Sequence, residues 1–314
     1  MSDEFEVAVI GGGIAGLSAA LTSARLGRST AILAGGLIGG QLVSINVIEG
    51  IPGFPDGVPG YDLCPMSQEQ ADAAGAKFIM AECESIAPDG DRLRLANSAG
   101  EIVAKGVIVA TGAALAKLGV PGEERLFGKG VSECASCDAP LLRGKAAVVV
   151  GGGDSGMQEA LTLAEHLSKV IIVERGEALT GQASYRQRVT GNPKIEIRYK
   201  TIVTEIIGDE VVSAVRIKDL GSRAESDLAA SGVFACTGLL PNNALVRELV
   251  PLDRTGRLRV DAAMRTPIRG VCAAGNVRQA SPHRAAQWAT ALMRRSRLTA
   301  ILRPASGASL VEGR

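Results

Sequence analysis

Two stretches of this sequence, "VAVIGGGIAGLSAA" (7–20) and "AVVVGGGDSGMQEA" (147–160), follow the same pattern. Each begins with four apolar residues typical of a buried strand, continues through Gly-x-Gly-x-x-Gly, and ends in residues that favour a helix. In such a unit the first glycine permits a tight turn, the second lets a pyrophosphate approach the backbone, and the third lets helix and strand pack closely. The phosphates of a dinucleotide then lie at the helix N-terminus.

The glycine motif is repeated in the same strand–turn–helix context, which makes it far more specific than a single glycine turn. The closing segments correspond as well, because 107–112 ("VIVATG") and 233–238 ("VFACTG") are apolar strands that end in Thr-Gly. We therefore predict an α/β protein with two Rossmann-like dinucleotide-binding domains; two glycine-rich units that bind nothing are the alternative. The motif residues are Gly11, Gly13 and Gly16 in the first copy, and Gly151, Gly153, Asp154, Ser155 and Gly156 in the second.

The two domains are predicted to be nested rather than consecutive. One more apolar strand, "GVCAAGNV" (270–277), and a helical segment from about Pro282 follow the second copy and can return to complete the first domain. We therefore expect residues 1–113 and 243–314 to form one domain and residues 114–242 to form the other.

The composition agrees with this fold and argues against other classes of protein. Hydrophobic residues make up 46% of the chain, aromatic residues only 3%, and 39 of the 314 residues are glycine; this mixture suits buried parallel strands joined by glycine turns. The net charge is +1 and the charges are interspersed, so neither a nucleic-acid nor a membrane partner is expected. The acidic N-terminus enters a strand directly, without a signal peptide, and we expect a cytoplasmic protein.

A third motif lies between the two glycine motifs. The stretch "VSECASCDAP" (131–140) places Cys134 and Cys137 three positions apart, with Asp138 directly behind them. A structural zinc site needs a second close pair of ligands, but the other four cysteines stand far apart and the chain has only two histidines. A structural disulfide here would close a very short loop and add little stability. The spacing therefore favours a pair that is oxidised and reduced reversibly, with zinc and a structural crosslink as the less favoured alternatives.

Taken together, these motifs resemble the low-molecular-weight thioredoxin reductases of the pyridine nucleotide-disulfide oxidoreductase superfamily, over most of the chain. Further stretches that carry the resemblance are "GGQL" (39–42), "VIEGIPGFP" (47–55), "ATG" (110–112), "TGLLPN" (237–242) and "AAGNV" (273–277). The resemblance implies that the first domain holds FAD, that the inserted domain holds a reduced nicotinamide nucleotide and rotates between two poses, and that the protein is a homodimer.

The resemblance also assigns roles to individual residues. Cys137 would meet the flavin, Cys134 would exchange with the substrate, and Asp138 would protonate a leaving thiolate; a helix N-cap is the alternative role of Asp138. The FAD-binding residues would be Gly11, Gly13, Gly16, Gly39, Gly40, Gln41, Thr111, Gly112, Gly275, Asn276 and Val277. The nicotinamide-nucleotide-binding residues would be Gly151, Gly153, Asp154, Ser155, Gly156, Glu174 and Arg175.

Three positions near the expected flavin depart from the family pattern. Asn276 replaces an aspartate, Gly50 replaces an asparagine, and "HRAA" (283–286) replaces Arg-Gln-Ala. Because an amide can both donate and accept hydrogen bonds, we expect FAD to be retained.

The choice of nicotinamide nucleotide is predicted to differ from the family's habit. The strand expected in "KVIIVERGEAL" (169–179) ends in Glu174, Arg175 and Gly176 where NADPH-using members carry His-Arg-Arg, and Thr180 stands where a later arginine would be. Glu174 lies 23 residues after Gly151, close to the spacing at which an acid binds the ribose 2′-hydroxyl of NAD. Its carboxylate would repel a 2′-phosphate, so NADH is favoured over NADPH; a merely structural role for Glu174 at the strand end is the alternative.

The predicted function is that of a flavin-dependent disulfide oxidoreductase. Electrons would pass from NADH or NADPH to FAD, to the Cys134–Cys137 disulfide, and on to a thioredoxin-like protein or a small disulfide. One alternative is an FAD-dependent dithiol oxidase that forms a disulfide in a small molecule or peptide with oxygen as acceptor, which the altered flavin pocket would favour. The second alternative is a flavin-binding sensor without catalysis, and the complete Cys-x-x-Cys-Asp motif argues against this alternative.

Overall fold

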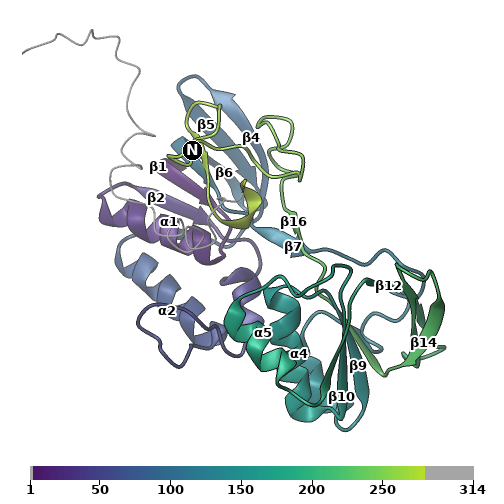
Figure 1. The fold of residues 1–314 in the computed structure, drawn as a ribbon. Coiled ribbons are helices and arrows are strands. Elements are labelled where there is room, and N and C mark those ends of the chain that lie inside the picture. Colours follow the sequence, from purple (N-terminus) through teal and green to yellow (C-terminus); the bar gives the residue numbers. More distant parts are fainter. Residues whose placement is uncertain (1–2, 280–314) are drawn as a thin grey trace, which may run out of the picture. The chain divides into compact units, whose positions relative to one another are not determined.

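The computed structural model describes residues 3–279, which divide into two units (Figure 1). Residues 3–113 and 241–279 form the first unit, and residues 114–240 form the second. Since the first unit consists of two chain segments, the second unit is an insertion in it. The helical segment expected from about Pro282 and the stretch 283–286 lie outside the described residues.

A largely parallel sheet forms the centre of the first unit. Strand β1 (Asp3–Ile10) pairs in parallel with β2 (Thr30–Leu33) and with β6 (Gly100–Val109). The later part of β6 also pairs in parallel with β17 (Val271–Ala273), so the chain returns to this sheet after the inserted unit. The sheet is completed by β3 (Lys77–Ile79), parallel to β2, and by the antiparallel strands β5 (Arg92–Asn97) and β4 (Cys83–Asp89).

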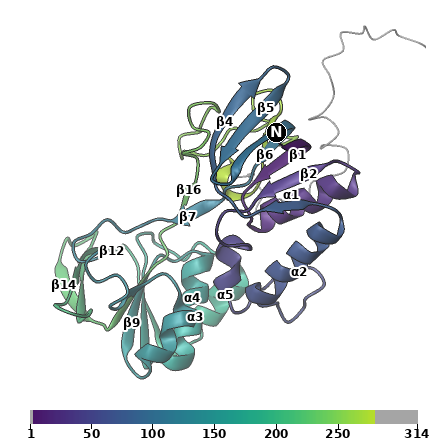
Figure 2. The ribbon, with the colours of Figure 1, turned by 180° about the vertical axis from the view of Figure 1, so that it is seen from behind.

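Both faces of this sheet are covered, which explains why residues 7–10 are apolar without interruption. Helix α1 (Ile14–Arg25) packs Leu17, Ala19 and Ala20 against Val7 and Val9 on one face. Figure 2 shows α1 and α2 (Gly60–Ala73) from behind, on the same side of the strands. The short 3-10 helices η1 (Gly40–Ser44) and η3 (Gly275–Val277) belong to this unit too.

The second unit repeats the arrangement in a smaller form. Its five parallel strands have the order β11-β10-β9-β15-β8, with β9 at the centre. The strands are β8 (Val131–Ser132), β9 (Ala146–Val150), β10 (Lys169–Val173), β11 (Ile195–Arg198) and β15 (Gly232–Ala235). The helices are α3 (Ala135–Asp138), η2 (Ala139–Leu142), α4 (Asp154–His166) and α5 (Ala183–Thr190). A separate antiparallel sheet contains β12 (Thr201–Ile207), β13 (Ala214–Asp219) and β14 (Glu225–Ala229).

In both units the strand before the glycine turn has its successor on one side and the closing strand on the other. Strand β1 lies between β2 and β6, and β9 lies between β10 and β15. Strand order therefore reverses at the glycine turn, and in open α/β sheets such a switch point opens a crevice for ligands at the carboxyl ends of the strands. The two segments that join the units, β7 (Ala113–Leu115) and β16 (Leu239–Pro241), pair with each other. The predicted α/β class is confirmed.

Candidate active site

The glycine turn of the first unit is shaped for close approach to the backbone. Gly11 has a positive φ of 112°, and a Cβ there would collide with the carbonyl of Ala110. A Cβ on Gly16 would collide with the carbonyl of Gly11. Only a glycine at position 16 therefore lets the first turn of α1 pack against the glycine turn. Gly13 is the N-cap of α1, and a Cβ there would meet nothing within 4 Å. The helix N-terminus is therefore open to an anionic ligand.

A cavity of about 520 Å³ lies at this turn. Its volume is within the range of small-molecule and cofactor sites. It is lined by nine residues that the sequence predicted for FAD: Gly11, Gly13, Gly39, Gly40, Gln41, Thr111, Gly112, Gly275 and Asn276. Among these, the Gln41 side chain donates a hydrogen bond to the carbonyl of Ala113 over 2.7 Å, and Asn276 is exposed.

The remaining residues named for this site do not line the cavity. Gly16 packs against the turn, and Val277 is fully buried in the core. Gly50 has a positive φ of 79°, is exposed, and is not one of the residues that line the cavity. The glycine-rich wall and the Asn276 amide nevertheless suit an elongated, polar cofactor, because backbone amides and an amide side chain can both donate and accept hydrogen bonds.

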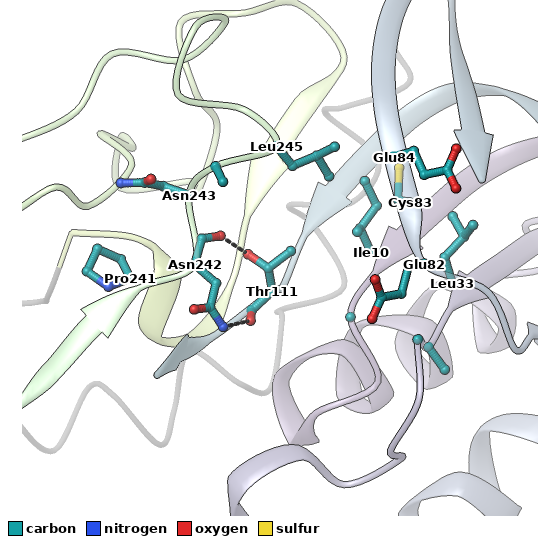
Figure 3. A pocket seen from close by; sticks show the side chains of 14 residues that line it. Ile10, Leu33, Glu82, Cys83, Glu84, Thr111, Pro241, Asn242, Asn243 and Leu245 are labelled. Atoms are coloured by element: carbon teal, nitrogen blue, oxygen red, sulfur yellow. Dashed lines mark hydrogen bonds between the residues drawn. The ribbon is translucent and has the colours of Figure 1, made fainter. Parts of the chain in front are cut away.

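A second cavity of about 710 Å³ adjoins the first (Figure 3). The two share several lining residues, among them Gly11, Thr111 and Asn242. Thr111 donates a hydrogen bond from its hydroxyl to the carbonyl of Asn242 over 2.7 Å, and the Asn242 side chain donates to the carbonyl of Thr111 over 2.9 Å. This reciprocal pair fixes the chain where it re-enters the first unit. Glu82 and Asn242 line both cavities, but they were not named as FAD-binding residues from the sequence.

Cys134 and Cys137 form a disulfide at the start of α3, with their Cα atoms 5.3 Å apart. Cys134 is the N-cap of this short helix, and its sulfur accepts a hydrogen bond from the backbone N–H of Cys137 over 3.2 Å. The backbone N–H of Cys134 donates in turn to the hydroxyl of Ser132 over 3.1 Å. A backbone N–H that already points at the Cys134 sulfur would stabilise a thiolate there after reduction.

Asp138 ends α3 directly behind the pair. It occupies the N-cap position of η2, but its side chain makes no capping hydrogen bond. Asp138 therefore stands at the N-cap position that the alternative role required, but without the capping hydrogen bond. Its carboxyl group is half-exposed.

Glu159 is a further group beside the pair that the sequence did not indicate. It comes from α4, and its carboxylate accepts a hydrogen bond of 2.6 Å from the backbone N–H of Ala135. Burial raises the pKa of Glu159 above its ordinary value, although this hydrogen bond opposes the shift. Burial, with the nearby Glu159 charge, raises the pKa of the Cys236 thiol to about 12. Cys236 is therefore a neutral thiol at physiological pH and takes no part as a nucleophile.

The glycine turn of the second unit repeats the geometry of the first. Gly151 has a φ of 118°, and a Cβ there would collide with the carbonyl of Cys236. A Cβ on Gly156 would collide with the carbonyl of Gly151, while a Cβ on Gly153, the N-cap of α4, would meet nothing within 4 Å. In the first turn of the helix, Ser155 is exposed and Asp154 accepts a hydrogen bond from the backbone N–H of Gln182 over 2.6 Å.

Glu174 lies directly after β10 and faces this turn. One carboxylate oxygen accepts from the backbone N–H of Gly152 and the other from that of Gly176, each over 2.6 Å. The structural role at the strand end is therefore real, but each oxygen keeps a lone pair for a ligand hydroxyl. Arg175 is exposed beside it.

The family model for pyridine nucleotide-disulphide oxidoreductases matches residues 5–294. The chain belongs to this family. It is 34% identical to a thioredoxin reductase of Treponema pallidum (strain Nichols), over 90% of this chain and 91% of that protein. The fold matches the crystal structure of Lactococcus lactis thioredoxin reductase with a TM-score of 0.90, 31% identity and coverage of 95% and 99% of the two chains. The crystal structure of T. acidophilum thioredoxin reductase matches with a TM-score of 0.88 and 33% identity, and the match covers 96% of this chain and 98% of that chain.

These relatives confirm the resemblance to the thioredoxin reductases and the fold with two dinucleotide-binding domains. The chain is an FAD-dependent oxidoreductase that uses a nicotinamide nucleotide. The relatives are reductases, which supports a disulfide oxidoreductase and not the dithiol oxidase considered above.

Within residues 3–279, no three His, Cys, Asp or Glu side chains are grouped so that they could hold a metal ion. In the same part of the chain, no helix is long and apolar enough to cross a membrane.

Proposed function

We propose that this protein is an NADH-dependent reductase that delivers electrons through the Cys134–Cys137 pair to a disulfide on a thioredoxin-like protein or a small molecule. The observation that carries the proposal is the pair itself: it stands at the start of α3, and in the same unit α4 begins at a nucleotide-type glycine turn. The first unit contributes a second such turn, with a cavity of about 520 Å³ for FAD. A chain with these parts has a place for the electron donor, the relay and the disulfide.

In the first unit, the residues around the cavity of about 520 Å³ would hold FAD. The open N-terminus of α1, after Gly13, would bind its pyrophosphate through backbone N–H groups. Asn276 and Gln41 would contact the flavin half through their amides. When bound, FAD supplies the two-electron relay between a nicotinamide and a disulfide.

In the second unit, the turn at residues 151–156 would hold the nicotinamide nucleotide. Gly153 leaves the N-terminus of α4 open for the pyrophosphate. Glu174 would accept hydrogen bonds from the hydroxyls of the adenosine ribose. Because both of its oxygens are already bound to backbone N–H groups, the carboxylate cannot easily turn away from a 2′-phosphate. This fixed charge favours NADH over NADPH.

At the cysteine pair, the two electrons and one proton that a hydride from NADH carries would break the S–S bond and leave Cys134 as a thiolate and Cys137 as a thiol. The Cys134 thiolate attacks one sulfur of the substrate disulfide, and a mixed disulfide forms as one substrate thiolate leaves and takes a proton from Asp138. Asp138 then removes the proton of Cys137. The Cys137 thiolate attacks the Cys134 sulfur, which restores the Cys134–Cys137 disulfide and releases the second substrate thiolate.

The relatives are named thioredoxin reductases, and this supports a thioredoxin-like protein as the substrate. The homodimer stays a prediction from the family resemblance. The direct test is turnover of the purified protein with NADH, a bacterial thioredoxin and a chromogenic disulfide as final acceptor. We expect thioredoxin-dependent release of the coloured thiol. Bleaching of the flavin by NADH without reduction of thioredoxin or of the chromogenic disulfide would refute the proposed function.

A further inference from the structure

The side chain that packs against the middle glycine of the turn differs between the two units. In the second unit, a Cβ on Gly152 would lie 2.6 Å from a carboxylate oxygen of Glu174. In the first unit, a Cβ on Gly12 would lie 3.0 Å from the Cβ of Ala34. Ala34 directly follows β2 and Glu174 directly follows β10, and each of these is the next strand after the glycine turn and its helix. Ala34 therefore occupies the place that the acid occupies in the repeat.

This difference removes an expected ligand from the FAD site. In dinucleotide-binding folds, an acid at the end of the second strand binds the hydroxyls of the adenosine ribose. The methyl group of Ala34 accepts no hydrogen bond, and the two residues that follow, Gly35 and Gly36, have no side chains. The first unit therefore needs another acceptor at this position if it is to hold the ribose by the same chemistry.

Glu82 places a carboxylate at this position from the segment between β3 and β4. A Cβ on Gly35 would lie 3.6 Å from the Cγ of Glu82, so the Glu82 side chain runs directly beside the loop that lacks the acid. Glu82 lines both adjoining cavities of the first unit, and Figure 3 shows its side chain among those that surround the larger one.

The backbone around Glu82 is held firmly against the same loop. The backbone N–H of Gly35 donates to the carbonyl of Ala81 over 3.2 Å, and that of Ala34 donates to the carbonyl of Ile79 over 3.0 Å. On the other side, the backbone N–H of Ser98 donates to the carbonyl of Glu82 over 3.3 Å. Glu82 is thus fixed between two bonded neighbours, while its side chain is exposed to the cavity.

We propose that Glu82 is the residue that positions the adenosine ribose of FAD, by accepting hydrogen bonds from its 2′- and 3′-hydroxyls in place of the acid missing at Ala34. The inference rests on the proposed binding of FAD in the first unit. Glu84 provides a matched control, because it is an exposed acid that lines the larger cavity but not the one at the glycine turn.

The test measures FAD affinity of the full-length protein by flavin fluorescence, after FAD has been removed and added back. We expect Glu82→Gln to weaken FAD binding about tenfold, because hydrogen bonds to a charged acceptor are lost. Glu84→Gln should change the affinity less than twofold. The double variant Ala34→Glu with Glu82→Gln should regain most of the lost affinity, since it restores the acid at the place that the second unit uses.

Competition between FAD and adenosine diphosphates separates a ribose contact from a general charge effect. The wild-type protein should prefer ADP over 2′-deoxy-ADP and 3′-deoxy-ADP about tenfold, and Glu82→Gln should lose this preference. If the wild type binds FAD but Glu82→Gln binds FAD and all three diphosphates equally well, the inference about Glu82 is wrong. If the wild type takes up no FAD at all, the proposed function fails as well, so the two failures are distinguishable.

Discussion

Neutralising Glu174 should change which nicotinamide nucleotide the protein prefers. The Glu174→Gln substitution removes the negative charge that faces the second glycine turn while keeping the size of the side chain. Two unit charges 4 Å apart interact with about 4 kcal/mol at an effective dielectric constant of about 20. Glu174 is only half-buried, and solvent and salt screen such a pair further. We therefore expect about 1.4 kcal/mol to remain, which is a factor of about ten.

The assay is stopped-flow bleaching of the flavin by NADH and by NADPH without oxygen. For the wild type, kcat/KM should be at least about tenfold higher with NADH, and in Glu174→Gln the ratio should fall by about tenfold. Glu177→Gln is the matched control, because Glu177 is an exposed acid on the same loop that pairs with Lys200 over 2.7 Å; its ratio should stay at the wild-type value.

Two outcomes would refute the role of Glu174. A wild-type preference for NADPH would mean that the carboxylate does not determine the nucleotide, and an unchanged ratio in Glu174→Gln would mean that it acts only on the backbone. Because the amide can accept from just one of the two N–H groups at Gly152 and Gly176, Glu174→Gln should also melt at a lower temperature. That loss is structural and should affect NADH and NADPH alike, so the ratio is the decisive quantity.

Other substitutions test the turns and the surroundings of the pair. Gly156→Ala should lower the melting temperature and abolish reduction of the flavin by NADH, because its Cβ would collide with the carbonyl of Gly151. Gly153→Ala should fold normally and weaken nucleotide binding. Equal melting temperatures for the two variants would contradict the geometry of the turn. Glu159→Gln should change how stability depends on pH. The folded-state pKa of Glu159 is raised above its ordinary value of 4.5, so the stability that its protonated form contributes is lost as pH rises through the folded pKa. The variant, which can still accept from Ala135, should therefore gain urea resistance relative to the wild type as pH rises above 4.5. A pH-independent difference would show that Glu159 does not titrate with a raised pKa.

The sequence predicted the strands and helices beside the two glycine turns, because short runs of adjacent residues determine them. The strands and helices on either side of each glycine turn follow from a few adjacent residues, since the turn needs glycine wherever a Cβ would collide with a carbonyl. The family resemblance is likewise a property of short motifs, and it is confirmed over most of the chain. The roles of the individual site residues stay predictions, because FAD and nucleotide binding have to be measured.

The residues that the sequence did not indicate act through contacts between distant segments. Glu159 bonds to Ala135, 24 residues away, and no spacing rule connects a position inside a helix with the residue after a cysteine. Glu82 reaches the loop at Gly35 from the segment between β3 and β4, and its relevance appears only when the first turn is compared with the second. Such groups become visible when the chain is folded, because tertiary packing and not sequence spacing brings them to the site.

The most direct test of the account is an anaerobic titration of the FAD-loaded protein with NADH. The wild type should consume about two equivalents of NADH per chain before excess NADH appears, one for FAD and one for the Cys134–Cys137 disulfide. The variant Cys134→Ser with Cys137→Ser should consume about one, still bleach its flavin, and lose disulfide turnover by more than about a hundredfold. One equivalent for both proteins, or disulfide turnover that survives in the variant, would contradict the claim that electrons leave through this pair.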